Sequence, residues 1–251
     1  MLRIGRLRDY LYDGVLPPDQ SSFENRLAIV EERIQRALSR SGRNRSDLTL
    51  VAVSKKFSSE NILIAYRSGL RHFGENYVQE FADKRPQLGE LADATYHLIG
   101  HLQSNKAKLA SELFNVIQTV DSPKLLRRLD DFARESGKTI EAFIEIKLSD
   151  EPSKTGVSAA GIAAILESAA GCSSVQLSGL MTIPPFSEDP EDSRPYFQEL
   201  SLLAQRFKLP KLSMGMSADF EIAIEEGATA IRVGTALFGK RPRPPASAPA
   251  Q

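Results

Sequence analysis

Apolar residues recur along the chain in two alternating patterns, one helical and one extended. The first helical stripe spans residues 22–41 and carries Phe23, Leu27, Val30 and Ile34 at intervals of three or four. A short, mostly apolar run follows at 48–54, where the helical spacing stops. The alternation between helical and extended spacing recurs up to residue 234. It predicts a chain of strands that alternate with helices.

Eight extended segments are predicted in this way. They lie at 48–54, 71–74, 96–100, 116–120, 142–148, 177–182, 211–215 and 230–234. Each except the last precedes a predicted helix, at 59–68, 76–85, 104–113, 122–136, 158–170, 190–207 and 217–226. Alternation of this kind favours a parallel sheet, and eight strands favour a single α/β (β/α)8 barrel of the TIM type with an N-terminal helix. A doubly wound sheet is the alternative, because strand counts from sequence err by about one or two.

The two ends of the chain differ from this pattern. Residues 1–20 are expected to form an irregular extension, and residues 241–251 are a Pro/Ala-rich tail that we expect to be disordered. Residues 21–240 are then the barrel. The Arg and Leu residues near the start resemble a weak amphipathic element, but acidic residues follow at once, so we expect no targeting role.

Composition narrows the class of protein. The 251 residues are 41% hydrophobic and 25% charged, with 32 Lys plus Arg balanced by 32 Asp plus Glu. This balance predicts binding neither to nucleic acid nor to an anionic membrane. The single cysteine cannot form an internal disulfide, and no apolar run is long enough to span a bilayer. We expect a cytoplasmic protein.

In a barrel of this type, functional residues lie at the carboxyl ends of the strands. Lys55 ends the first predicted strand, where partial loss of water favours a neutral amine that attacks an aldehyde. A solvated lysine is the plainer interpretation of this feature alone. Lys56 would point to the opposite side of the strand, so the two lysines should not be interchangeable.

The last two strands predict a phosphate site. Ser217 is a good N-cap for the following helix, Gly234 allows close approach of the backbone, and Thr235 adds a hydroxyl. Barrel enzymes often bind phosphate between these two loops. Arg232 lies inside an apolar strand and needs an acceptor, either a neighbouring carboxylate or a pyridine nitrogen.

Two further pairs of polar residues have plainer interpretations. His97 and His101 are four residues apart, but no third ligand is in register, so we predict no metal site. Glu145 and Lys147 should face one side of the fifth strand and form an internal ion pair.

Several longer motifs resemble the pyridoxal phosphate homeostasis protein family, which is itself similar to the barrel domain of alanine racemase. They are Leu50-Val-Ala-Val-Ser-Lys55, His72-Phe-Gly-Glu-Asn-Tyr-Val-Gln-Glu80, His97-Leu-Ile-Gly-His-Leu-Gln-Ser-Asn-Lys106, Ser178-Gly-Leu-Met181, Leu212-Ser-Met-Gly-Met-Ser-Ala-Asp219 and Ile231-Arg-Val-Gly-Thr-Ala-Leu-Phe-Gly239. The resemblance covers residues 22–240, with the motifs in the family's order.

The resemblance implies a fold-type III barrel that holds pyridoxal 5′-phosphate (PLP) as an aldimine on Lys55. The other cofactor-binding residues that it implies are Ser217, Gly234 and Thr235 at the phosphate, Arg232 at the ring nitrogen, Asn76 and His97 lining the site, and Met181 and Met214 nearby. It also implies a monomer that maintains intracellular PLP, with PLP-dependent apo-enzymes as recipients and without sustained catalytic turnover.

This chain departs from the family at three places, the first of which is the extension at residues 1–20, which has no counterpart in the family. The family usually has Ser-Lys-Thr-Lys-Pro where this chain has Ser54-Lys-Lys-Phe-Ser58, so the loop after Lys55 is expected to differ. The fifth strand often carries neutral amides where this chain has Glu145 and Lys147.

A racemase of small amino acids is the alternative function. A guanidinium at the pyridine nitrogen disfavours protonation of that nitrogen and so weakens the ring as an electron sink. Alanine racemases resemble this barrel but carry a further β domain, which supplies a tyrosine base across a dimer interface. Here a Pro-rich tail follows the barrel, so we expect a PLP carrier rather than a racemase.

Overall fold

The computed structural model describes residues 19–149, 151 and 155–240, so most of the extension and all of the tail lie outside the described residues. Eight parallel strands close into a barrel in sequence order. Their bounds are β1 Thr49–Val53, β2 His72–Glu75, β3 Thr95–Leu98, β4 Val116–Val120, β5 Ile140–Glu145, β6 Val175–Met181, β7 Lys211–Ser213 and β8 Ala230–Val233. The barrel closes where β8 pairs with β1, with Val51 opposite Arg232. The predicted (β/α)8 barrel is confirmed.

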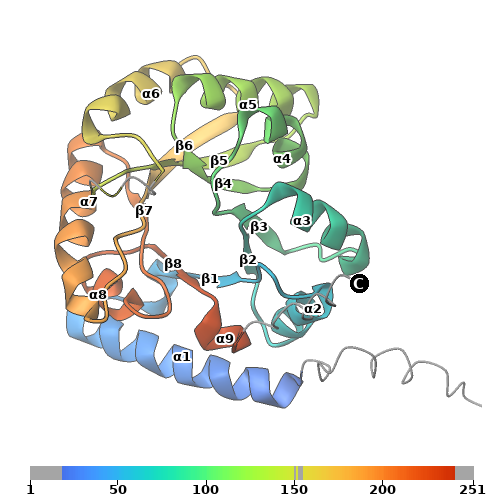
Figure 1. Cartoon of the computed structure of the whole chain (residues 1–251), viewed down its shortest axis with the longest axis vertical. Helices are drawn as coiled ribbons and strands as arrows, with labels where there is room; N and C mark the ends of the chain where they lie inside the picture. The colour runs from blue at the N-terminus through green and yellow to red at the C-terminus, as the bar shows by residue number, and fades with distance from the viewer. Residues whose placement is uncertain (1–18, 150, 152–154, 241–251) are drawn as a thin grey trace, which may run out of the picture.

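Helices surround the strands (Figure 1). Their bounds are α1 Gln20–Ser41, α2 Ser59–Arg67, α3 Val78–Lys84, α4 Ala107–Leu113, α5 Pro123–Glu135, α6 Ile162–Ala169, α7 Arg194–Phe207, α8 Phe220–Glu225 and α9 Thr235–Phe238. Short 3₁₀ turns lie at Arg45–Asp47, Arg85–Leu88, Ser104–Lys106, Ala159–Gly161 and Pro190–Ser193. The prediction that no helix follows the last strand is wrong, because α9 begins directly after Gly234.

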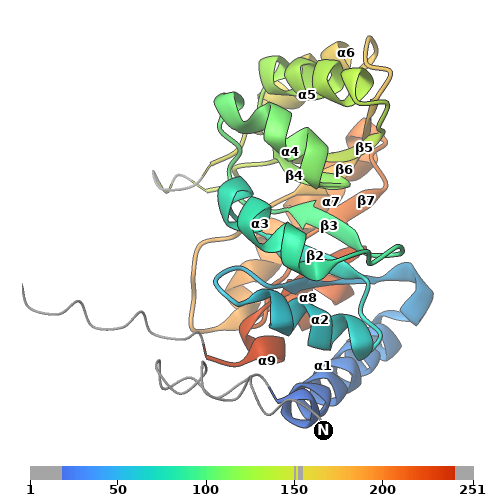
Figure 2. The same ribbon diagram turned by 90° about the vertical axis from the view of Figure 1, so that its right-hand side faces the viewer.

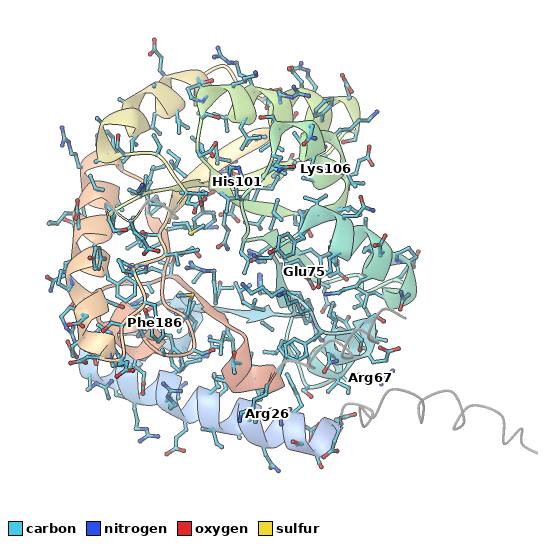
Figure 3. All side chains as sticks on the ribbon, in the orientation of Figure 1. Arg26, Arg67, Glu75, His101, Lys106 and Phe186 are labelled. Carbon is cyan, nitrogen blue, oxygen red and sulfur yellow. The ribbon has the colours of Figure 1, made fainter. Side chains whose placement is uncertain are left out.

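Helix α1 precedes the barrel and packs against α8 and α9, the helices on either side of β8 in the chain. The Asp19 carboxylate caps its first turn by accepting from the backbone N–H groups of Ser21 and Ser22. Figures 1 and 2 place α1 at one end of the molecule, against α8 and α9, with α5 and α6 at the opposite end. Arg26 of α1 donates to the Leu237 carbonyl at 2.6 Å, which ties this helix to α9 (Figure 3).

The strands are buried because helices cover their outer face and side chains fill the interior. All five residues of β4 are buried, and so are four of the five residues of β1. Most apolar residues of the chain join one continuous core between strands and helices. The interior also holds polar side chains, which Figure 3 shows among the strands. Among the described residues, no helix is long and apolar enough to cross a membrane.

Six of the eight predicted strands end one to three residues earlier in the structure, among them the first and the fifth. The first stops at Val53 rather than Ser54, because residues 54–57 form a tight turn in which Phe57 N–H donates to the Ser54 carbonyl. The fifth covers Ile140–Glu145 rather than 142–148. Ile146 N–H still donates to the Met181 carbonyl of β6, but Ile146 also pairs with Val157 on the returning loop, and Lys147 N–H donates to the Val157 carbonyl.

Candidate functional site

A cavity of about 240 Å³ opens at the carboxyl ends of the barrel strands. Its lining comes from the ends of β1, β2, β3, β6, β7 and β8 and from the loops that follow them. The lining residues are Val53, Lys55, Phe57, Asn76, Ile99, Ile183, Met216, Ser217, Ala218, Arg232, Gly234 and Thr235. Six of the nine predicted cofactor-binding residues are among them.

Lys55 reaches the cavity from a turn, not from a strand end. Lys56 adopts a left-handed conformation with φ of 64°, and its side chain is exposed while that of Lys55 is half-buried. The Lys55 ammonium lies 3.3 Å from Asn76 Oδ1. The two lysines therefore differ as predicted, but the turn separates them rather than the alternation of a strand.

A buried ionic cluster supports this turn. Lys84 Nζ donates to the Ser54 carbonyl at 3.1 Å, to Glu75 at 3.0 and 3.2 Å and to Glu80 at 2.6 Å. The same Glu80 oxygen accepts from the backbone N–H of Lys56 at 2.5 Å. The backbone on both sides of Lys55 is thus held by one buried cation and its partners.

Glu75 is the most deeply buried member of this cluster. Figure 3 labels it within the ring of helices, and none of its surface is exposed. Burial raises the pKa of its carboxyl group, while the nearby Lys84 ammonium acts in the opposite direction. Ser54 Oγ donates to Glu75 Oε1 at 2.7 Å, so this carboxylate also binds β1 to β2.

Ser217 faces the loop after β8. Its Oγ accepts from the backbone N–H groups of Gly234 at 3.3 Å and Ala236 at 3.4 Å. The exposed Thr235 lies between these two residues. The hydroxyl-bearing Ser217 and Thr235 and the backbone of Gly234 therefore form one edge of the cavity, which is an arrangement suited to an anion.

The prediction that Ser217 caps the following helix is wrong. Helix α8 begins at Phe220, and the residues before it form a turn in which Asp219 Oδ1 accepts from Met216 N–H at 2.6 Å. Asp219 thus closes the turn, and the Ser217 hydroxyl is left to face the β8 loop.

Arg232 brings a buried positive charge to the cavity. Its Nη1 donates to Ser213 Oγ at 2.8 Å and its Nη2 to the Thr182 carbonyl at 2.9 Å. Burial lowers the pKa of Arg232 to about 10, while Asp219 and Glu145 act in the opposite direction. The guanidinium therefore stays protonated at neutral pH, and it has N–H groups beyond these two for an acceptor in the cavity.

Three predicted residues do not line this cavity. His97 is buried below it, with Nδ1 3.0 Å from Gln118 Nε2 and Nε2 3.0 Å from His72 Nδ1. Burial, followed by the proximity of His72 and Lys211, lowers the pKa of His97 to about 3, so its ring is neutral.

The two methionines pack elsewhere. Met181 is fully buried in a small interior cluster with Val116 and Phe143, and Met214 belongs to the main core. Their place in the family's motifs does not bring them to the cavity wall in this structure.

Glu145 is not paired with Lys147 among the described residues, so the prediction of an internal ion pair is wrong. Glu145 Oε1 instead accepts from Thr155 Oγ1 at 2.7 Å, because the loop after β5 folds back over it. Glu145 Oε2 is buried without a hydrogen-bond partner among the described residues, and burial raises the pKa of this carboxyl group. No group of three metal-binding side chains occurs in the described part of the chain.

The sequence did not indicate the apolar wall of the cavity. This wall is formed by Val53, Phe57, Ile99 and Ile183, to which Met216 adds a thioether. An aromatic ring with a phosphate and an aldehyde would meet chemistry that suits each part. The anion-binding edge, the apolar wall, the guanidinium donors and the lysine amine all border one cavity.

Comparisons with known proteins agree with this chemistry. Residues 27–242 match the family model described as alanine racemase, N-terminal domain. The pyridoxal phosphate homeostasis protein of Aquifex aeolicus is 41% identical over 222 residues, which are 86% of this chain and 97% of the relative. That of Escherichia coli K12 is 39% identical over 228 residues, which are 88% of this chain and 97% of the relative.

Solved structures give the same relationship. PipY of Synechococcus elongatus, solved with PLP bound, is similar with a TM-score of 0.75 and 38% identity, covering 86% of this chain and all of PipY. An alanine racemase of Clostridium difficile shares the fold alone, with a TM-score of 0.68 and 13% identity, covering 87% of this chain and 58% of the racemase. Family model, sequence relatives and structure agree, and the chain belongs to the pyridoxal phosphate homeostasis protein family.

Proposed function

We propose that this protein binds PLP in the cavity at the mouth of the barrel and serves in PLP homeostasis. One observation carries the proposal: Lys55, Arg232 and the anion-binding edge formed by Ser217, Gly234 and Thr235 all line a single cavity. The relatives named for this role and the PLP-bound PipY structure support it.

Each part of the cofactor has a partner among the lining residues. The neutral Lys55 amine would condense with the aldehyde, forming a C=N bond with release of water. Ser217, Thr235 and the backbone N–H of Gly234 would bind the phosphate, and Arg232 would donate to the ring nitrogen. Asn76, which lies 3.3 Å from Lys55 Nζ, would orient the amine. Bound PLP supplies an electrophilic carbon and a conjugated ring.

We propose storage and release of the cofactor rather than turnover of amino acids. Of the described residues that line the cavity, only Lys55 and Arg232 are titratable. Arg232 remains protonated at neutral pH, which leaves a single base. Racemisation needs acid–base groups on both faces of the substrate. Release to PLP-dependent apo-enzymes by a monomer in the cytoplasm is part of this proposal.

Reduction of the cofactor-loaded protein with borohydride tests the covalent attachment. We expect a visible absorbance band on loading, and peptide mass spectrometry should locate the reduced adduct on Lys55. The Lys55→Ala variant should lose both signals, while Lys56→Ala should keep them because its side chain is exposed outside the cavity. An adduct mapped to another lysine, or no band in excess PLP, would contradict the proposal.

A further inference from the structure

Five side chains from five strands are joined by hydrogen bonds across the barrel interior. The distances are 2.8 Å for Arg232 Nη1 to Ser213 Oγ, 2.6 Å for Ser213 Oγ to Gln118 Oε1, 3.0 Å for Gln118 Nε2 to His97 Nδ1 and 3.0 Å for His97 Nε2 to His72 Nδ1. We call these residues the interior relay. Only Arg232 among them lines the cavity.

The guanidinium fixes the direction of every bond in the relay. Because Arg232 can only donate, Ser213 Oγ must accept from it and turn its own hydrogen to Gln118 Oε1. The Gln118 amide nitrogen then donates to His97 Nδ1. His97 therefore carries its proton on Nε2 and donates it to His72 Nδ1.

If the amide oxygen and nitrogen of Gln118 were exchanged, the hydrogen bonds of the relay could not all be satisfied. The amide nitrogen would donate to Ser213 Oγ, which already accepts from Arg232. The Ser213 hydrogen would then have no acceptor in the described part of the chain, and Ser213 has no exposed surface through which water could supply one. The relay thus has one satisfied arrangement.

Burial makes the relay act as a unit. Gln118 and Ser213 are 0% exposed, Arg232 is 3% exposed and His97 is 5% exposed. Loss of one hydroxyl or amide would leave its buried neighbours without partners. Bulk water cannot easily replace the bonds that join these four residues, whereas His72 at the end of the relay is only half-buried.

We infer that Ser213 and Gln118 are positioning residues that aim the Arg232 guanidinium at the ring nitrogen of bound PLP. This inference rests on the proposed function. Ser213 and the Thr182 carbonyl hold the two terminal nitrogens of Arg232. Without Ser213, the Thr182 carbonyl is the one remaining hydrogen-bond partner of the guanidinium among the described residues.

A competing acceptor makes this positioning necessary. Glu145 Oε2 is buried without a hydrogen-bond partner among the described residues, and its carboxylate interacts electrostatically with Arg232. A guanidinium released by Ser213 would turn toward this unpaired oxygen, since a hydrogen bond there would satisfy two buried polar groups. The relay therefore keeps the donor available to the cofactor.

A cofactor analogue separates positioning from general stability. The probe is the benzene analogue of PLP, in which a CH group replaces the ring nitrogen while the aldehyde and phosphate remain. We expect Ser213→Ala and Gln118→Leu to raise the dissociation constant of PLP about tenfold and to leave that of the analogue within about twofold.

Two matched variants control the experiment. Ser213→Thr retains the hydroxyl and should restore most of the affinity for PLP. Ser111→Ala removes another fully buried serine hydroxyl, which donates to the Lys108 carbonyl at 2.7 Å on α4, and should change neither dissociation constant.

Nitrogen-15 NMR of the histidine rings tests the direction of the relay without cofactor. We expect His97 to carry its proton on Nε2, with an unprotonated Nδ1 that shifts in Gln118→Leu. A proton on Nδ1 would overturn the relay. Equal losses of PLP and analogue affinity in the two variants, or no loss, would overturn the positioning role. Failure of the wild-type protein to bind PLP would instead contradict the proposed function, and the NMR result would still decide the relay.

Discussion

Lys84 donates a hydrogen bond to the backbone carbonyl of Ser54, the residue immediately before Lys55. A lysine from α3 therefore fixes the turn that presents the proposed cofactor amine. The same ammonium is paired with the fully buried Glu75 and with Glu80. Binding and folding depend on one cluster, because the charge that stabilises the Glu75 carboxylate also positions the cavity lysine.

Replacing Lys84 by Met should destabilise the protein by about 3–5 kcal/mol, because it leaves Glu75 buried without its cation. Urea unfolding monitored by circular dichroism measures this loss. The exposed Lys108 provides the control, and Lys108→Met should change the free energy of unfolding by less than about 0.5 kcal/mol. Equal stability of the two variants would show that the buried cluster contributes nothing.

His97 makes the stability depend on pH. Its pKa is about 3 in the native state, below the ordinary value of 6.5, so the unfolded chain binds a proton that the native state excludes. This contribution to stability is complete above pH 6.5 and decreases as the pH falls toward 3. At pH 5 the loss is about 2 kcal/mol.

His97→Gln should remove this part of the pH dependence, since the glutamine does not titrate. Denaturant unfolding at pH 7.5 and pH 5 measures the change for each protein. In the wild-type protein the free energy of unfolding should fall between pH 7.5 and pH 5, and we expect this fall to be about 2 kcal/mol smaller in the variant. The same pH dependence in both proteins would contradict a neutral, buried His97.

Close packing between the loops after β2 and β3 gives a third prediction. A Cβ added at Gly100 would lie 2.2 Å from the Asn76 carbonyl oxygen, so Gly100→Ala must displace the backbone that carries Asn76. We expect a loss of about 2–3 kcal/mol in stability and weaker PLP binding. In the control Gly171→Ala, the new Cβ would lie 3.8 Å from its nearest neighbour, and little change is expected. If Gly100→Ala changed neither the stability nor the PLP binding, the loop that carries Asn76 would be able to move at little cost.

A comparison of PLP with pyridoxal, which lacks the phosphate, tests the anion-binding edge. Ser217→Ala removes the hydroxyl that faces Gly234 and Ala236. We expect its dissociation constant for PLP to rise about tenfold and that for pyridoxal to stay within about twofold. Equilibrium titration by absorbance measures both. If the dissociation constants of PLP and pyridoxal rose equally, the phosphate would have to bind elsewhere.

The sequence predicts the barrel well because its evidence is local. Each strand and helix shows its own hydrophobic spacing, and the carboxyl ends of parallel strands must meet at one face. The family resemblance then assigns Lys55, Asn76, Ser217 and Arg232 to one site, and all four line the cavity. The turn at residues 54–57 could not be predicted, since its shape depends on Glu80 and Lys84.

The remaining contacts depend on packing between distant elements. Lys84 lies in a polar stretch that is typical of an exposed helix end, yet it is buried where it reaches the Ser54 carbonyl and Glu75. Gln118 and Ser213 are polar residues inside apolar strands, which indicates a buried partner but not which one. The bond between them joins β4 to β7, which are not neighbours in the barrel.

The last prediction concerns catalysis. A racemase needs one acid–base group on each face of the substrate, and the described cavity lining offers only Lys55 as a base at neutral pH. The PLP-loaded protein incubated with L-alanine should therefore produce no steady accumulation of D-alanine, as measured by chiral chromatography. Steady conversion that is lost in Lys55→Ala would reverse the interpretation, because it would require a second acid–base group at the mouth of the barrel. The Lys55→Ala control also separates turnover in this cavity from conversion by free cofactor.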